Sequence, residues 1–235
     1  MFAPVSMLEV NSFPGAWTAL VKECMEKGIE INFGDPKDKK IAKEIVSMVV
    51  IGPKGVREIL NKKLPSQVLF KGKQLDEYIM EYTREFVEKQ KGLDDEDLQK
   101  HPYTYMGRFL FPNDQVNTTV EGIKSQQDSQ ILSNRVQMTT WVPEIDSYLS
   151  TSPPCLQRIW FRCDLENKRL DVHFNWRSRD LFDAWTANLI GLVWMINEYI
   201  AKPLGFRVWR VIDISDSLHI YDYNWNIALA VAKKN

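Results

Sequence analysis

Cysteine and histidine are both scarce in this chain, with three of each among 235 residues. Three cysteines cannot build a fully paired disulfide framework, and their uneven spacing does not match a zinc motif. The histidines show no metal-ligand spacing either. These shortages predict a protein without a resident metal, in a reducing compartment such as the cytoplasm.

The chain also lacks an excess of charge of one sign and a long apolar run. Lys and Arg total 30 against 31 Asp and Glu, so the formal net charge is −1. This balance argues against binding of polymeric nucleic acid and leaves room only for a local anion site. The longest apolar run, Leu189–Ile196, falls far short of the roughly 18 residues that span a bilayer. The first residues do not resemble a secretion signal, so we expect no membrane partner.

What the sequence does have is the composition of an ordinary globular protein, with 44% hydrophobic and 26% charged residues. Disordered, collagen-like and coiled-coil chains deviate strongly from such values. A chain of this length is also long enough to bury a deep core. We therefore predict a single domain that spans residues 1–235.

Apolar periodicity predicts a mixture of helices and strands. Spacings of three and four predict helices from around Trp17 to Gly28 and at 73–89, 112–134 and 180–201. β-branched runs and period-two alternation predict strands at 29–33, 45–51, 136–141, 158–163, 169–175 and 208–214. The strands at 158–163 and 169–175 should form an antiparallel hairpin. Residues 91–100, 146–154 and the acidic stretch after Ile214 are expected to be a loop, a linker and a turn.

Cys155 stands apart from the other two cysteines. It follows Pro153 and Pro154 and precedes a predicted strand, a position that can present a thiol at the end of a sheet. Cys24 lies on a helical apolar stripe and Cys163 on an alternating strand face. Both fit the core, because a free cysteine packs as a small hydrophobe. Cys155 could have the same structural role as a core residue.

Asn188 interrupts the apolar stripe of the helix predicted at 180–201. A buried amide must find partners, or it costs on the order of 1–3 kcal/mol. Its acceptor and two donors could read the edge of a planar heterocycle, or they could bond to neighbouring backbone groups in the core. The residues alone leave both interpretations open.

Polar side chains stand on both sides of that helix. Arg177 and Ser178 precede it, and a guanidinium near a strand-to-helix junction suits a phosphate. His219 and Tyr221 are separated by one residue, so an extended segment would project them to one side, where they could bind a sugar hydroxyl. Solvated turn residues and an ordinary aromatic strand end are the alternatives.

Taken in order along the chain, these features resemble thymidylate synthase. The resemblance is carried by the segments Asn134-Arg135-Val136, Pro153-Pro154-Cys155, Arg177-Ser178-Arg179-Asp180, Asn188 and Asp216-Ser217-Leu218-His219-Ile220-Tyr221. It covers the last hundred residues well and the first hundred loosely, and the compact beginning is similar to the short archaeal branch of the family. This sequence departs from the family at Leu156, Asn134 and Trp176, where His, Arg and Gln are usual.

The resemblance implies an α/β (α+β) fold with a mixed or antiparallel sheet flanked by helices, and a homodimer whose two sheets pack back to back. It also implies that Cys155 attacks C6 of the pyrimidine of dUMP. The nucleotide would then be methylated by a methylene-tetrahydropterin, of the tetrahydrofolate or tetrahydromethanopterin type, to give dTMP. No metal is implied.

The same resemblance implies how the phosphate and the sugar are held. Arg177 and Ser178 would bind the 5′-phosphate, and Arg135 would reach it from the partner subunit. His219 and Tyr221 would bond the ribose 3′-hydroxyl.

The resemblance further implies residues for the base, the pterin and the proton transfers. Asn188 would read the N3–H and O4 edge of uracil, and Asp180 would hold the pterin ring. Glu85 is the expected catalytic glutamate, with Glu81 and Glu44 as alternatives.

Two other functions remain open at this point. One is a pyrimidine-nucleotide 5-hydroxymethylase of the same superfamily, acting on dUMP, dCMP or CMP, in which water rather than hydride captures the exocyclic methylene. Asn188 favours uracil over cytosine as its base. The other is a non-catalytic nucleotide-binding relative, which the departures at Leu156 and Asn134 motivate.

Overall fold

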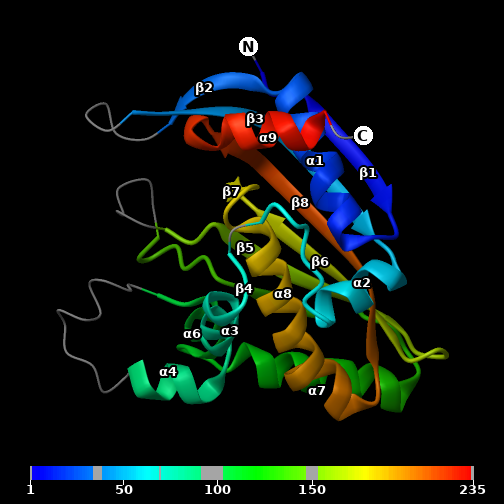
Figure 1. The fold of residues 1–235 in the computed structure, drawn as a ribbon. Helices are drawn as coiled ribbons and strands as arrows, with labels where there is room; N and C mark the ends of the chain where they lie inside the picture. Colours follow the sequence, from blue (N-terminus) through cyan, green and yellow to red (C-terminus); the bar gives the residue numbers. More distant parts are fainter. Residues whose placement is uncertain (1, 34–38, 69, 91–102, 147–152, 234–235) are drawn as a thin grey trace.

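A mixed β-sheet runs through the molecule, with helices packed against it (Figure 1). The computed structural model describes residues 2–33, 39–68, 70–90, 103–146 and 153–233. The main path of the sheet is β1 (Val5–Val10), β3 (Lys40–Ile51), β8 (Arg207–Tyr221), β6 (Arg169–Trp176), β5 (Leu156–Asp164) and β4 (Gln137–Thr139). Off this path, β2 (Ile29–Phe33) pairs with β3, and β7 (Arg179–Asp180) pairs with β8. The predicted mixed sheet flanked by helices is confirmed.

The sheet contains both parallel and antiparallel pairs. β1 runs parallel to β3 and β6 runs parallel to β8, whereas β3–β8, β5–β6 and β4–β5 are antiparallel. The predicted hairpin of β5 and β6 is confirmed, with Ile159 opposite Phe174 and Cys163 opposite Leu170. These residues are buried, as are Phe161 and Val172, while the residues that alternate with them are not, because one face of the hairpin packs into the core.

The helices of the described chain are α1 (Phe13–Lys27), α2 (Pro53–Leu60), α3 (Lys73–Met80), α4 (Arg84–Gln90), α6 (Tyr105–Leu110), α7 (Gln115–Ser129), α8 (Trp185–Ile196) and α9 (Trp225–Ala232). A π-helical turn, Asn197–Ala201, and a 3₁₀ turn, Lys202–Leu204, continue α8. Every residue of α8 except Trp194 is buried, which explains why its sequence is apolar all round. No helix in the described ranges is long and apolar enough to cross a membrane.

One face of the sheet carries apolar side chains that remain accessible. Val5 and Met7 on β1 are 71% and 69% exposed. Their cross-strand neighbours Val46 and Met48 are half-buried, and so is Ile214, which lies opposite Met48. We call these five residues the outer face. A patch of this kind is typical of a surface that meets another protein chain.

The predicted helix over 73–89 is wrong in its continuity, because the chain forms α3 and α4 with a break between them. The Thr83 hydroxyl donates to the carbonyl of Met80 at 2.7 Å and accepts from the backbone N–H of Phe86 at 3.2 Å. It therefore closes one helix and caps the next. The predicted loop 91–100 and most of the predicted linker 146–154 lie outside the described residues.

The predicted acidic turn after Ile214 is also wrong, because β8 continues unbroken to Tyr221. The register against β3 shifts between the pairs Ser47–Ser215 and Ile45–Leu218, so β8 carries one extra residue there. Such a bulge disturbs the pairing without ending the strand. The acidic and hydroxyl side chains that suggested a turn occupy this bulge.

The predicted helix over 180–201 begins later than expected, at Trp185. The preceding residues are in strand β7, and Asp180 Oδ1 accepts the N–H groups of Phe182 and Asp183 at 2.9 and 3.0 Å. This local turn competes with helix formation. It aims Asp180 along the start of α8 rather than outward from a first helical turn.

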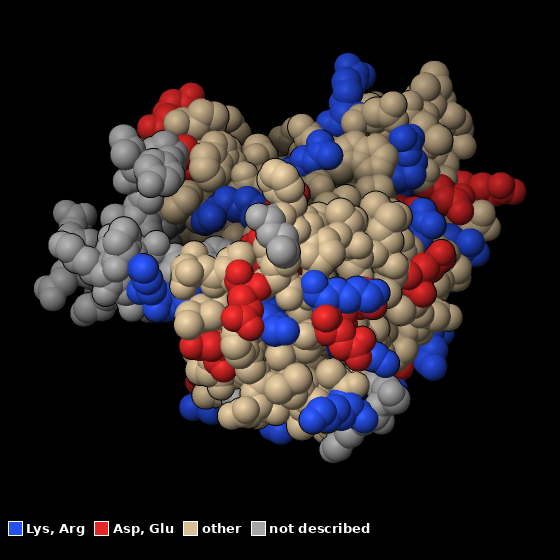
Figure 2. Space-filling view, turned by 90° about the horizontal axis from the view of Figure 1, so that it is seen from above, with Lys and Arg blue, Asp and Glu red and all other residues tan. Residues whose placement is uncertain are grey.

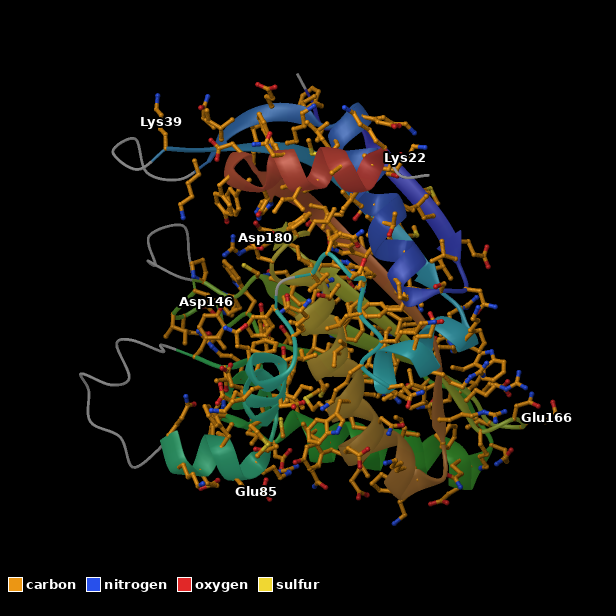
Figure 3. The ribbon with its side chains drawn as sticks, viewed as in Figure 1. Lys22, Lys39, Glu85, Asp146, Glu166 and Asp180 are labelled. Carbon is orange, nitrogen blue, oxygen red and sulfur yellow. The ribbon has the colours of Figure 1, made fainter. Side chains whose placement is uncertain are left out.

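The backbone of residues 142–146 is held by an ion pair. Arg108 of α6 donates to both carboxylate oxygens of Asp146 at 2.9 and 3.0 Å, and Asp146 also accepts the N–H of Val142 at 2.8 Å. Asp146 is only 4% exposed. A bidentate pair of this kind holds the chain in one geometry, close to the point where Figure 3 labels Asp146.

A close packing contact joins α8 to the segment between α3 and α4. A Cβ atom built on Gly191 would lie 2.3 Å from Cε2 of the Tyr82 ring. No side chain at that position avoids the ring, and Tyr82 itself is 2% exposed. Gly191 is therefore needed for the close approach of a helix to a buried aromatic ring.

Gly191→Ala should destabilise the fold by roughly 1–3 kcal/mol, because the new methyl group must displace a buried ring. The loss would be seen as a lower midpoint in urea unfolding. Gly122→Ala on α7 is the matched control, since its Cβ would meet the Val136 methyl at 3.2 Å and the neighbour needs to move little. Equal stabilities of the two variants would contradict the packing argument.

Candidate active site

A cavity of about 280 Å³ lies where β6, β7 and β8 meet the start of α8. Its lining combines aromatic rings with polar groups, namely Tyr78, Tyr105, Cys155, Trp176, Ser178, Arg179, Asp180, Ala184, Asn188, His219 and Tyr221. Six of the residues singled out in the sequence are therefore brought together, although they come from positions 155 to 221. A small number of convergent polar groups in an apolar pocket is the usual form of a ligand site.

Cys155 lies at the wall of the cavity, next to a guanidinium. Arg177 donates through Nε to the carbonyl of Pro154 at 2.9 Å and through Nη2 to the carbonyl of Pro153 at 2.6 Å. The same Nη2 lies 3.8 Å from the Cys155 sulfur. The backbone carbonyls of the two prolines thus hold the Arg177 side chain, and its guanidinium lies beside the Cys155 thiol.

Opposing effects act on the ionisation of Cys155. Burial raises the pKa of its thiol, while the positive charges of Arg177 and Arg179 act to lower it. Burial also raises the pKa of Cys163 to about 11 and that of Cys24 to about 12. Cys155 is the partly exposed thiol of the three, so it combines accessibility with two nearby cations.

The floor of the cavity is a buried arginine that the sequence reasoning did not single out. Arg179 pairs with Asp213, and its Nη2 donates to the Trp185 carbonyl at 3.0 Å. Its guanidinium carbon lies 3.8 Å from the centre of the Trp176 ring. Arg179 and Asp213 are 2% and 1% exposed. The departure at Trp176 thus supplies the ring on which this cation stacks.

Asp180 and His219 are both shifted away from their charged forms. Burial raises the pKa of Asp180 to about 6, although two backbone N–H groups oppose the shift. Burial lowers the pKa of His219 to about 4, so its imidazole is neutral at physiological pH. A neutral imidazole keeps one donor and one acceptor for hydroxyl groups.

A polar group stands behind His219. The Ser217 hydroxyl lies 3.5 Å from His219 Nδ1 and donates to the carboxylate of Glu44 on β3. His219 contacts Tyr221 edge to face at 4.9 Å, and Lys40 Nζ lies 5.7 Å from the centre of the Tyr221 ring. These contacts fix the side of the cavity that β8 provides.

Two further tyrosines, Tyr78 and Tyr105, line the cavity, and Tyr82 lies next to Tyr78; from the sequence, their hydroxyl groups were given no role. Tyr78 lines the cavity and bonds Asn188, Tyr82 lies behind it, and Tyr105 packs edge-on against Trp176 at 5.8 Å. Tyr78 and Tyr82 are four residues apart, and this spacing in a helix could have revealed two adjacent hydroxyl groups on one face.

Two predicted site residues are not brought to this cavity. Arg135 is exposed and lines a separate groove along α7, where its Nε lies 3.4 Å from the Ser133 hydroxyl. Glu85 is exposed on α4, and Figure 3 shows it at the opposite end of the molecule from Asp180. The break before α4 removes Glu85 from the face that carries Tyr78. Glu81, in contrast, acts electrostatically on both Tyr78 and Tyr82.

The surface charges are mixed rather than gathered into one field. Lys and Arg alternate with Asp and Glu over the face seen in Figure 2, as the near-zero net charge requires. In the part of the chain that the structure describes, no three His, Cys, Asp or Glu residues are grouped so that they could hold a metal ion. Arg177, Arg179 and Lys40 are cations that contact residues of the cavity.

Sequence comparison agrees with this geometry. The family model for thymidylate synthase matches residues 83–234, a range that contains all cavity residues except Tyr78. Proteins named "Putative thymidylate synthase" from Methanothermobacter marburgensis and Methanothermobacter thermautotrophicus are each 27% identical over 96% of this chain and 97% and 98% of their own. One with the same name from Methanosarcina mazei is 26% identical over 81% of this chain and 79% of its own. The chain belongs to the thymidylate synthase family.

Proposed function

We propose that the protein is a thymidylate synthase that converts dUMP to dTMP with a methylene-tetrahydropterin as the one-carbon donor. The observation that carries this proposal is the juxtaposition of Cys155 with the Arg177 guanidinium at 3.8 Å, in a cavity that also holds Asn188 and His219. A thiol beside a cation is suited to nucleophilic attack.

In this reaction the sulfur of Cys155, as the thiolate, would bond to C6 of the uracil ring. The electron pair of the C5–C6 double bond would move toward C5 and O4, which makes C5 nucleophilic. Arg177 and Arg179 favour the thiolate, since their charges act to lower the pKa of Cys155. Their charges oppose the effect of burial, which on balance leaves the pKa of the Cys155 thiol above its ordinary value, so the two arginines lower the cost of forming the thiolate in the cavity.

The nucleotide would be held at three points. The Nη1 group of Arg177 takes part in none of the three contacts described for its side chain, so together with Ser178 it can bind the phosphate. His219 and Tyr221 would bond the sugar hydroxyl, for which the neutral imidazole is suited. Asn188 would read the base.

The pterin supplies the one-carbon unit and the hydride, and its ring presents several N–H donors. Asp180 fits this need, because only Oδ1 is used for the two backbone bonds and an ionised carboxylate is an acceptor. We assign proton transfer at the base to Glu81, in place of Glu85, because Glu81 directly follows α3, which carries the cavity-lining Tyr78, whereas Glu85 is exposed on α4. Both the folate and the methanopterin types of pterin are supplied in the tests below.

The active unit would be a homodimer joined through the outer face. Val5 and Met7 expose apolar surface there, and a twofold pairing of such a face would bury it on both copies. Arg135 is exposed and is not at the cavity of its own chain. We propose that it completes the phosphate site of the partner subunit.

Replacement of the nucleophile tests the activity directly. Cys155→Ser should lower the rate of dTMP formation by at least about 1,000-fold, because the hydroxyl is a far weaker nucleophile. It should also abolish the covalent adduct that the wild type forms with 5-fluoro-dUMP and a methylene-tetrahydropterin, as measured by mass spectrometry. Cys163→Ala, which changes a buried thiol away from the cavity, is the control and should form the adduct.

No adduct with the wild type, for either pterin type, would contradict the proposed synthase and favour a non-catalytic nucleotide-binding protein. A hydroxymethylated nucleotide as the product would identify the hydroxymethylase instead. dUMP, dCMP and CMP should therefore be supplied in parallel.

Asp180 should make stability depend on pH. Its pKa is about 6 in the fold and about 4 in an unfolded chain, so the folded state binds the proton more tightly and ionisation costs stability as the pH rises. Asp180→Asn should be more stable than the wild type by about 1–3 kcal/mol at pH 8, with the difference shrinking between pH 6 and pH 4. Urea unfolding at both ends of this range is the measurement. A variant that is less stable at pH 8 would show that Asp180 is not buried as an ion.

Subunit mixing tests the dimer. Cys155→Ser and Arg135→Ala should each be inactive, but a mixture re-associated in equal amounts should recover about one quarter of the wild-type rate, because each heterodimer contains one intact site. Met48→Glu on the outer face should sediment as a monomer. A mixture that stays inactive while the wild type sediments as a dimer would contradict the role of Arg135 across the interface.

A further inference from the structure

A chain of hydroxyl groups stands behind Asn188. The Nδ2 of Asn188 donates to the Tyr78 hydroxyl at 2.5 Å, and the Tyr78 and Tyr82 hydroxyls lie 2.8 Å apart. Asn188 and Tyr82 are 8% and 2% exposed. The amide that faces the cavity is thus connected to two phenols from a distant part of the sequence, of which Tyr78 is half-buried and Tyr82 is buried.

The two phenols are held firmly in place. The Tyr78 ring makes edge-on contacts with Phe70 at 5.7 Å and with Tyr82 at 5.4 Å. The Tyr82 ring is in turn confined by Gly191, where there is no room for a Cβ. Burial raises the pKa of Tyr78 to about 12 and that of Tyr82 well above its ordinary value. Both hydroxyls therefore keep their protons, and the position of the Tyr78 oxygen is fixed by packing.

The orientation of an amide decides which pyrimidine it can read. Uracil presents a donor at N3 and an acceptor at O4, whereas cytosine presents an acceptor at N3 and a donor at N4. Turning the Asn188 amide by half a rotation exchanges its oxygen and its nitrogen, and so exchanges the base that it matches. In the structure Asn188 Nδ2 donates to the Tyr78 hydroxyl, which leaves the amide oxygen and the second N–H for a ligand. The Tyr78 hydroxyl, which accepts from the amide, can give its own hydrogen to Tyr82 at 2.8 Å, and a hydrogen committed in that way is not available to the oxygen of the turned amide.

We propose that Tyr78, supported by Tyr82, is a specificity-determining positioning residue that holds the Asn188 amide in the orientation that pairs with a 4-keto pyrimidine and rejects a 4-amino pyrimidine. This assignment rests on the proposed function, because it requires that Asn188 meets the base. Tyr78 acts through Asn188, so its effect should appear as discrimination between bases rather than as a general loss of binding.

The test compares the dissociation constants of dUMP and dCMP, measured by calorimetry without any pterin. The wild type should prefer dUMP, and Tyr78→Phe should reduce the ratio of the two constants by roughly tenfold, because the amide loses its partner and can turn. Tyr82→Phe should reduce the ratio in the same direction. Tyr199→Phe, whose ring contacts Trp194 and Arg84 away from the cavity, is the matched control and should leave the ratio unchanged.

A double-mutant cycle separates positioning from a structural effect. In the Asn188→Ala background, Tyr78→Phe should change the ratio by less than about twofold, because the group through which it acts is absent. Thermal unfolding of each variant shows whether the fold is retained. An unchanged ratio in Tyr78→Phe, or an equal fall with and without Asn188, would overturn the proposal.

The two proposals fail in different ways. A wild type that binds dUMP and forms dTMP while Tyr78→Phe keeps its full preference overturns only the role of Tyr78. If the wild type binds dUMP no better than dCMP, the role of Tyr78 is also overturned, whichever product the enzyme forms. A wild type that binds neither nucleotide overturns both proposals.

Discussion

The cavity depends on the ion pair between Arg179 and Asp213. Arg179 belongs to β7 and Asp213 to β8, and Trp185 at the start of α8 contacts both, through its carbonyl and through its indole nitrogen at 2.7 Å from the carboxylate. Breaking a pair buried this deeply leaves an uncompensated charge, at a cost of about 3–5 kcal/mol. The pair therefore fixes where the two strands and the helix meet, and with them every group that lines the site.

A second consequence of this arrangement is electrostatic. Arg179 is a buried positive charge, and its charge acts on the Cys155 thiol. Stacking on Trp176 holds the guanidinium plane, so the charge does not need to reorganise when a substrate enters. Preorganised charges of this kind act more strongly than solvated ones. The same burial keeps His219 neutral and brings the pKa of Asp180 close to neutrality.

Much of the fold follows from local patterns in the sequence. The β5–β6 hairpin and α1 come from strong periodicity, and α1 ends at Gly28 as expected. The break at Thr83 and the bulge in β8 do not, because each depends on a single side chain or residue that competes with a regular element. Position in the chain and periodicity singled out Cys155, Asn188 and His219, and the family resemblance supplied the roles that we expect for them.

The parts of the site that could not be predicted are those made by distant contacts. Tyr78 and Asn188 are 110 residues apart, and neither sequence segment indicates a contact with the other. Arg179 stood in a recognised motif, but its partner Asp213 lies on another strand and gave no signal in the sequence. Glu85 was expected from the family resemblance, and the break at Thr83 places it exposed on α4, whereas Tyr78 lies on α3. Long-range pairing of polar groups is decided by tertiary packing, which sequence spacing does not record.

The bulge in β8 has a consequence for how sequences of this kind can change. Just before it, between Val211 and Ser215, the buried residues of the strand are odd-numbered, and after it the core-facing residues are even-numbered, as at Leu218 and Ile220. This change of phase is what frees His219 for the cavity. Deleting one residue between the two stretches would turn the His219 imidazole into the core and a leucine or isoleucine into the site. The number of residues in this segment is therefore as important for the active site as the identity of its side chains.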